Sequence, residues 1–282
     1  MWTEVNMLSM RPPNVGIMKN RYHIVFTVFF ASLCVLSCSV KENREPCPCY
    51  LEITFPQRNE VTHGVGLSAW HSKFLFFDDI DLGDYPDVYL RAVERQELVV
   101  CAYTGRYKAL RDERKMMIPF GSQCDSLYSF YKEVDCSGEN ASCEVNFLKQ
   151  FATVTVDIRK SAAEMQHYSM KASGNTCGFD LLSFTPVLGP FECNVTALQN
   201  DYVFRFRIPR QVDSSFLLTL AKDGRDICEY PLGRLIELTG YDWTDPDLHD
   251  IFVSIDHTVS ILTIRVEDWD YEENFDLKQV IL

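Results

Sequence analysis

The sequence lacks a hydrophobic run long enough to cross a membrane as a helix. Its main apolar run, residues 24–36, contains thirteen residues, whereas a spanning helix needs about 20. The basic residues Lys19 and Arg21 precede this run. A short basic segment followed by a short apolar segment is typical of a secretory signal peptide rather than of a membrane span.

The sequence also lacks the short motifs that mark common active sites. It contains neither H-E-x-x-H nor G-x-S-x-G, and Gly64-Val65-Gly66 is not followed by the third glycine of a dinucleotide loop. The acidic cluster over residues 78–87 departs from a calcium loop at Gly83 and Leu90. We therefore expect no enzymatic activity, no metal and no cofactor. A hydrolase site assembled from distant residues is a rival interpretation without a nucleophile motif to support it.

Basic charge is scarce. The chain has 27 basic and 40 acidic residues, of which residues 1–37 hold three and one, so 24 and 39 remain after them and the net charge is −15. Such a chain repels phosphate, which excludes nucleic acid as a partner. The acidity fits a secreted or surface-exposed body.

A lipobox ends the signal peptide. In Val35-Leu36-Ser37-Cys38, a small residue directly precedes the cysteine and apolar residues precede it in turn. We predict a lipoprotein signal peptide over residues 18–37, a lipid such as palmitate on Cys38, and a flexible tether over residues 38–46. An ordinary signal peptide with an incidental cysteine is the alternative. Residues 1–17 are interpreted as a non-native extension ahead of a start at Met18, and an ordered extension is the alternative.

Cysteine, by contrast, is abundant. Nine cysteines remain after Cys38, and outside the cytoplasm such residues usually form disulfides. An odd number leaves at least one free or paired between chains. The first pairs to test are Cys136 with Cys143 and Cys177 with Cys193, since each pair brackets a short segment rich in turn residues.

Strand patterns dominate the rest of the chain. Residues 153–158 and 202–208 alternate between apolar and polar side chains, the period of a half-buried strand. Two segments follow a helical pattern instead: residues 127–134, and residues 232–238 between Pro231 and Gly240. The fold class predicted is therefore all-β, a pair of β-sandwiches with one or two short helical insertions. We place the N-terminal domain at 47–143 and the C-terminal domain at 144–282.

The order of these features resembles one known family. The segments that carry the resemblance are the lipobox, the polar tether, 47–55 (CPCYLEITF), 74–79 (FLFFDD), 147–156 (FLKQFATVTV), 231–241 (PLGRLIELTGY), 250–256 (DIFVSID) and 266–269 (VEDW). Together they resemble the minor-fimbrillin anchor lipoproteins of type V fimbriae in Bacteroidota. The nine cysteines after Cys38 exceed what that family's pattern requires.

The resemblance implies two tandem transthyretin-like β-sandwich domains, an outward-facing position on the cell outer membrane, and a role at the base of a fimbria. The implied partners are the outer membrane, through lipid, and the fimbrial stalk (major fimbrillin) subunit, joined by strand exchange. Donor-strand candidates lie in the C-terminal tail, residues 275–282: Phe275, Leu277, Val280 and Leu282. The tail closing its own sheet is equally open. The alternative function is a surface glycan-binding lipoprotein with Trp70, Trp243 and Trp269 as a platform.

Overall fold

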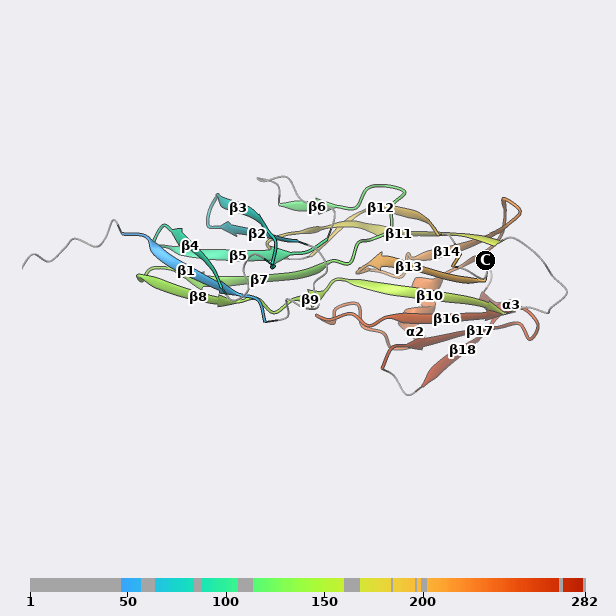
Figure 1. Cartoon of the computed structure of the whole chain (residues 1–282). Coiled ribbons are helices and arrows are strands. Elements are labelled where there is room, and N and C mark those ends of the chain that lie inside the picture. Colours follow the sequence, from blue (N-terminus) through green and yellow to red (C-terminus); the bar gives the residue numbers. More distant parts are fainter. Residues whose placement is uncertain are drawn as a thin grey trace, which may run out of the picture. The chain divides into compact units, whose positions relative to one another are not determined.

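A computed structural model describes residues 47–56, 64–83, 88–105, 114–159, 168–183, 185–195, 197–198, 202–268 and 271–280. The lipobox, Cys38 and the tether therefore lie outside the described residues. Residues 48–282 form one compact unit. Its secondary structure is almost entirely β, as Figure 1 shows.

The N-terminal sandwich consists of two sheets around one core. The three-stranded sheet has the order β4-β1-β8, with β1 Cys49–Thr54, β4 Tyr89–Val93 and β8 Asn140–Glu144. The five-stranded sheet has the order β3-β2-β5-β7-β9, with β2 Val65–Trp70, β3 Phe74–Ile80, β5 Glu97–Tyr103, β7 Tyr128–Asp135 and β9 Leu148–Lys149. Apolar side chains from both sheets meet between them, as alternation along the strands requires.

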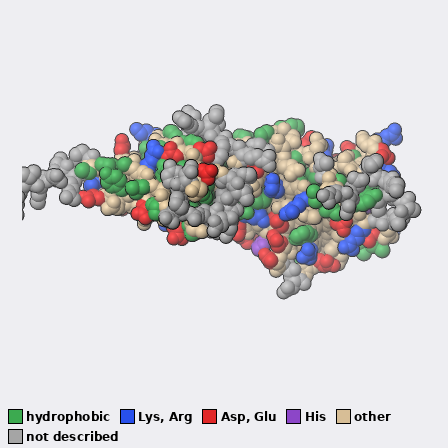
Figure 2. Space-filling model, in the orientation of Figure 1, with side chains coloured by type: hydrophobic (Ala, Val, Ile, Leu, Met, Phe, Trp, Pro, Cys, Tyr) green, Lys and Arg blue, Asp and Glu red, His purple; other side chains and the backbone are tan. Residues whose placement is uncertain are grey.

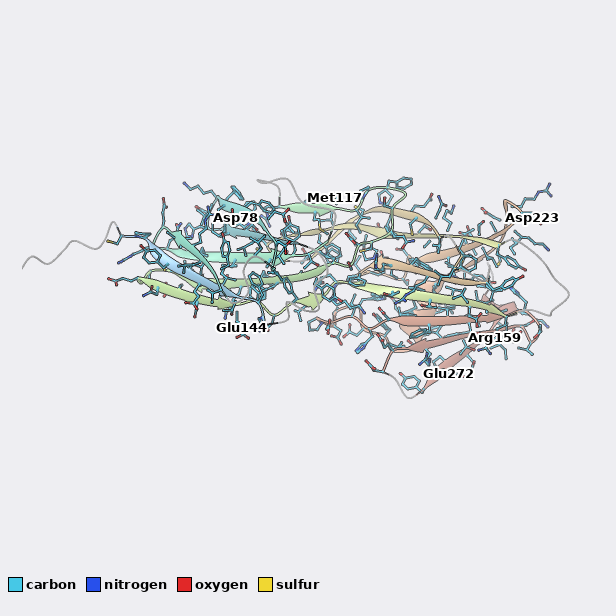
Figure 3. All side chains as sticks on the ribbon, viewed as in Figure 1. Asp78, Met117, Glu144, Arg159, Asp223 and Glu272 are labelled. Carbon is cyan, nitrogen blue, oxygen red and sulfur yellow. The ribbon has the colours of Figure 1, made fainter. Side chains whose placement is uncertain are left out.

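The C-terminal sandwich also consists of two sheets (Figure 1). Here each sheet has five strands. One has the order β13-β10-β16-β17-β18, with β10 Phe151–Arg159, β13 Val203–Pro209, β16 Ile251–Asp256, β17 Ile261–Val266 and β18 Glu272–Asp276. The other joins β12-β11-β14-β15 and adds β6 at β11, with β6 Lys115–Met117, β11 Tyr168–Asp180, β12 Pro186–Val195, β14 Leu217–Lys222 and β15 Arg225–Tyr230. Figure 3 shows the side chains that project from both faces of these strands.

The alternation predicted at residues 202–208 is confirmed in β13. Phe204, Phe206 and Ile208 are buried, whereas Arg205 is exposed on the opposite face. Their burial joins this strand to a core that the whole C-terminal sandwich shares. The all-β sandwich class predicted from such patterns is the class observed.

The two sandwiches share elements across the predicted boundary at residue 143. Strand β6 precedes that boundary in sequence but pairs with β11, while β9 follows it and pairs with β7. Tyr103, Met116 and Leu127 likewise belong to the core of the C-terminal sandwich. The boundary itself stays a prediction, and the strands on its two sides are interleaved.

The helix predicted over residues 127–134 is wrong. Leu127 directly precedes strand β7 and the other residues belong to it; β7 pairs with β5 from Ser129 opposite Tyr103 to Asp135 opposite Glu97. The spacing that seemed helical includes Tyr131, whose side chain is 53% exposed. Aromatic residues are also good strand formers, and here the pairing with β5 outweighs a four-residue coincidence of spacing.

The second predicted helix is confirmed as α2, Leu232–Leu238. Gly240 ends it with φ +86°, and its N–H donates to the carbonyl of Glu237 at 3.0 Å. Glycine adopts this left-handed conformation without steric cost, so it terminates helices well. A short helix, α3 Leu277–Val280, follows β18. Among the described residues, no helix is long and apolar enough to span a membrane.

Candidate functional site

The first strand is held on both sides. In β1, Leu51 pairs with Arg91 of β4 in antiparallel register and with Ala141 of β8 in parallel register. The inward side chains Cys49, Leu51 and Ile53 are 0% exposed. A chain segment that enters the sandwich through β1 is therefore joined to it by two rows of hydrogen bonds and by the core.

The outer face of β1 and β4 carries a small apolar surface. Tyr50 is 49% exposed and Leu90 is 61% exposed, and both strands present these side chains to solvent. Figure 2 shows hydrophobic side chains near the start of the described chain, with acidic and basic side chains beside them. The apolar surface lies where the predicted tether would enter the fold.

The C-terminal tail packs against its own sandwich in this structure. Phe275, in β18, pairs with Leu262 of β17 and contacts the core. Leu277 is 3% exposed, and its N–H donates to the carbonyl of Ser260 at 2.9 Å. The side chain of Val280 and all of Leu282 lie outside the described residues. Donation of this tail to a neighbour stays a prediction, and it would require Phe275 and Leu277 to leave this core.

Most of the described cysteines are buried, Cys47 and Cys228 being the exceptions. Cys49, Cys136 and Cys143 belong to the core of the N-terminal sandwich. Cys193, on β12, lies opposite Gly121, and Cys177 donates to the carbonyl of Val187 at 3.6 Å. The pairs predicted from sequence stay predictions: Cys136 with Cys143, and Cys177 with Cys193.

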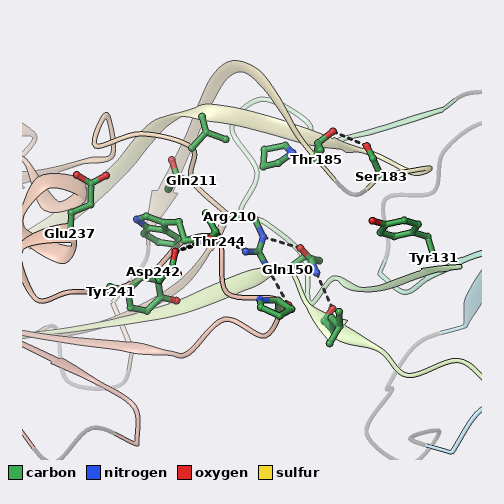
Figure 4. A pocket seen from close by; sticks show the side chains of 15 residues that line it. Tyr131, Gln150, Ser183, Thr185, Arg210, Gln211, Glu237, Tyr241, Asp242 and Thr244 are labelled. Atoms are coloured by element: carbon green, nitrogen blue, oxygen red, sulfur yellow. Dashed lines mark hydrogen bonds between the residues drawn. The ribbon is translucent and has the colours of Figure 1, made fainter.

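A pocket of about 720 Å³ is lined by residues that directly follow β13 and by residues of the loop that follows α2. Arg210 directly follows β13 and is 8% exposed. Its guanidinium donates to the side chain of Gln150 at 3.0 Å and to the carbonyls of Trp243, of Asp245 at 2.6 Å and of Pro246 at 3.2 Å (Figure 4). The side chain of Arg210 therefore links residues 243–246 to Gln150 through hydrogen bonds.

The tryptophan platform predicted for a glycan site is not formed by the described residues. Trp70 and Trp243 are each 7% exposed. Trp70 packs edge-on against Phe74, and Trp243 packs edge-on against Tyr241 with ring centroids 4.7 Å apart. A sugar stacks on an open aromatic face, which neither ring offers. Trp269 lies outside the described residues.

Two residues of the acidic cluster, Asp78 and Asp81, make hydrogen bonds within the N-terminal sandwich. Asp78 accepts hydrogen bonds from the hydroxyl of Tyr89 and the guanidinium of Arg91, which ties β3 to β4. Burial, and then the hydrogen bond to Asp78, raises the pKa of Tyr89 to about 12. Asp81 accepts from the Gly83 N–H at 2.9 Å. No group of metal-binding side chains is found in the described part of the chain. Two members of the acidic cluster, Asp84 and Asp87, lie outside it.

Sequence comparisons give no relative: no protein-family model and no curated protein matches the chain. Solved structures do match it. A candidate polysaccharide-binding protein from Bacteroides thetaiotaomicron is 13% identical with a TM-score of 0.58, over 82% of this chain and 99% of that chain. A candidate adhesin from Bacteroides ovatus is 11% identical with a TM-score of 0.55, over 81% of this chain and 96% of that chain.

The fimbrial anchor protein Mfa2 from Porphyromonas gingivalis is 13% identical with a TM-score of 0.51, over 79% of this chain and 98% of that chain. The chain has the fold of a fimbrial anchor protein. The resemblance inferred from the sequence motifs is thus confirmed at the level of the fold. These neighbours are named for adhesion, binding and fimbrial anchoring, and none for catalysis.

Two features of the site were missed by the sequence reasoning. One is the role of Arg210, and the other is the crossing segment, residues 114–124, which reaches the C-terminal sandwich from the first half of the chain. In the crossing segment, Gly121 donates to the carbonyl of Glu192 at 2.9 Å and Cys124 to the carbonyl of Arg207 at 3.2 Å. The apolar spacing of this short segment carries no period that could have predicted either contact.

Proposed function

We propose that this chain is a lipid-anchored outer-membrane subunit at the base of a type V fimbria. Lipid on Cys38 would hold the chain in the cell outer membrane, and the sandwiches would face outward to bind the stalk (major fimbrillin) subunit. The observation that carries the proposal is the fold shared with a fimbrial anchor protein, in a chain whose lipobox lies just before the first strand. The role requires attachment and no catalysis.

The physical basis of attachment is simple. One acyl chain binds a membrane only marginally, whereas two or more give stable anchoring. A pull on the fimbria would pass through the sandwiches into β1 and then into the tether. The two rows of hydrogen bonds on β1 lie along that direction and would be loaded in shear. The intact first strand thus supports a role in which the lipid end of the chain bears force.

Assembly by strand exchange would make this chain the end of the polymer. In strand exchange, the terminal strand of one subunit completes the sheet of a neighbour through main-chain hydrogen bonds. Accepting a strand in place of β1 would expose Leu51 and Ile53, which are fully buried, and would separate the tether from the fold. We therefore propose that the chain donates a strand from its tail and keeps its own first strand.

The test is Cys38→Ala in a strain that makes the fimbria. We expect the variant to fold, to lose its lipid, and to shed fimbriae into the medium, because the base of the polymer is no longer held. Electron microscopy of cells and immunoblots of the medium would measure the loss. Cys34→Ala is the matched control, since it removes a cysteine from the same segment and should leave fimbriae on the cell. Fimbriae still held by the Cys38→Ala strain would refute the proposal.

A further inference from the structure

Two cysteines from distant parts of the sequence meet at one end of the N-terminal sandwich. Cys49 begins β1 and pairs with Val93, the last residue of β4. Cys136 directly follows β7, and its N–H donates to the carbonyl of Gln96 at 3.1 Å. Only residues 94–96 separate β4 from β5, so this short turn holds both cysteines at the same level. Both residues are 0% exposed and belong to the same core, and the neighbouring Cys49 thiol adds to the burial that raises the pKa of Cys136.

The register places the third cysteine of this core elsewhere. Cys143 lies opposite Ile53 in the parallel pairing of β1 with β8. Ile53 is four residues beyond Cys49 along β1, which corresponds to about 13 Å of strand. A disulfide needs Cα atoms no more than about 7 Å apart. Cys143 is thus beyond the reach of Cys49, whereas Cys136 lies at the level of Cys49 in the same core.

We propose that Cys49 and Cys136 form a disulfide that locks the first strand to the N-terminal sandwich. As the S–S bond forms, the two thiols lose two protons and two electrons. The disulfide of an extracytoplasmic thiol–disulfide oxidoreductase accepts them and becomes a dithiol. The bridge joins the strand next to the tether with the end of β7, a strand from the opposite sheet.

The disulfide forms during folding, before β1 has docked, rather than in the folded protein. Exchange requires a thiolate, and burial raises the pKa of Cys136 to about 12. The thiolate is therefore scarce once β1 has docked, and both residues are then 0% exposed, which hinders an oxidant from reaching them. Once formed, the bond is protected from reduction for the same reasons.

The disulfide gives the proposed anchor a covalent route for force. Without it, a pull on the tether is resisted only by the hydrogen bonds and side-chain packing of β1. With it, the load passes directly from Cys49 to the end of β7, which pairs with β5 over seven residue pairs, from Ser129 to Asp135. This purpose rests on the proposed function, whereas the bond itself rests on the positions of the two cysteines.

Peptide mapping tests the proposal. The full chain, exported by its own signal peptide, is denatured in N-ethylmaleimide to trap free thiols and is digested without reduction. A Cys47→Ser background removes the exposed neighbour that would share a peptide with Cys49. We expect mass spectrometry to find Cys49 linked to Cys136 in this background and in Cys143→Ser. Alkylated Cys49 and Cys136, or a Cys136–Cys143 link, would overturn the proposal.

A second measurement examines the fold. Reduction should lower the urea midpoint of the parent chain more than that of Cys136→Ala, because the variant has no Cys49–Cys136 bond to lose. An equal shift in both proteins would contradict the bridge. Neither measurement needs fimbriae, so failure of the Cys38→Ala experiment and failure of the disulfide can be told apart.

Discussion

Arg210 controls the loop that follows α2. It is almost fully buried, yet its donors reach four oxygen atoms on two separate segments, Gln150 and residues 243–246. Burial lowers the pKa of Arg210 from its ordinary value, and the carboxylates of Asp245 and Asp242 oppose that effect. A guanidinium remains charged under such conditions, and its planar fork suits several carbonyl acceptors at once.

We expect Arg210→Ala to lower the free energy of unfolding by roughly 2–4 kcal/mol, because buried carbonyls would lose their donor. Urea denaturation followed by tryptophan fluorescence measures this, and Trp243 lies in the affected loop. Arg205→Ala is the control, since Arg205 is exposed on the neighbouring strand β13 and its removal should change stability by less than about 0.5 kcal/mol. Equal stability of the two variants would mean that the loop holds its course without Arg210.

Strand β6 shows how an element can be placed by a partner far along the chain. It has three residues, Lys115–Met117, and it pairs with β11 at Gly178 and its neighbours. A Cβ at Gly178 would lie 2.3 Å from the carbonyl oxygen of Met116. The close approach of the two backbones therefore depends on glycine at this position.

Gly178→Ala should push β6 away from β11 and destabilise the fold by about 1–3 kcal/mol, the usual range for overpacking. Hydrogen exchange at residues 115–118 should accelerate more than exchange in the N-terminal sheets. Gly138→Ala is the matched control, because the nearest atom to its Cβ would be 3.7 Å away. Unchanged protection of β6 in Gly178→Ala would show that the backbone can relax without loss of the pairing.

The sequence correctly predicted a strand or a helix where the side-chain pattern was long or was bounded by specific residues. Residues 202–208 alternate over a full strand, and α2 is framed by Pro231 and Gly240. Residues 127–134 had neither advantage: three of the four apolar positions that matched a helix belong to β7, and Leu127 directly precedes it. Pairing with β5 decides that segment, and a pairing partner 26 to 38 residues away is invisible to local periodicity.

For the molecule as a whole, the C-terminal tail has one observed role and one proposed role that would compete with it. Here it contributes Leu277 to the core of its own sandwich. Donation to a neighbour would trade this contact for one in the partner, so the two roles exclude each other at any one time. If the proposal holds, this exclusion would let the tail control assembly, since the tail would leave its own sandwich only for a better partner site.

Leu277→Ala should lower the free energy of unfolding of the isolated chain by roughly 2–4 kcal/mol, because it empties a buried site. Differential scanning calorimetry would measure the change. Leu238→Ala, at a side chain that is 60% exposed, should be nearly neutral. A neutral Leu277→Ala would mean that the tail contributes little to its own sandwich and is available for donation at small cost.

Sequence by itself determined the β-rich class, because side-chain alternation is written directly into neighbouring residues. It also supplied the lipobox prediction, the helix at α2 and the acidic charge that argues against nucleic acid. Only the tertiary structure decided that β6 joins a sheet of the second sandwich, that Arg210 donates to carbonyls within residues 243–246, and that Cys136 shares a core with Cys49. Each of these depends on residues that lie tens of positions apart, and strand pairing sets such contacts through backbone register rather than through local pattern.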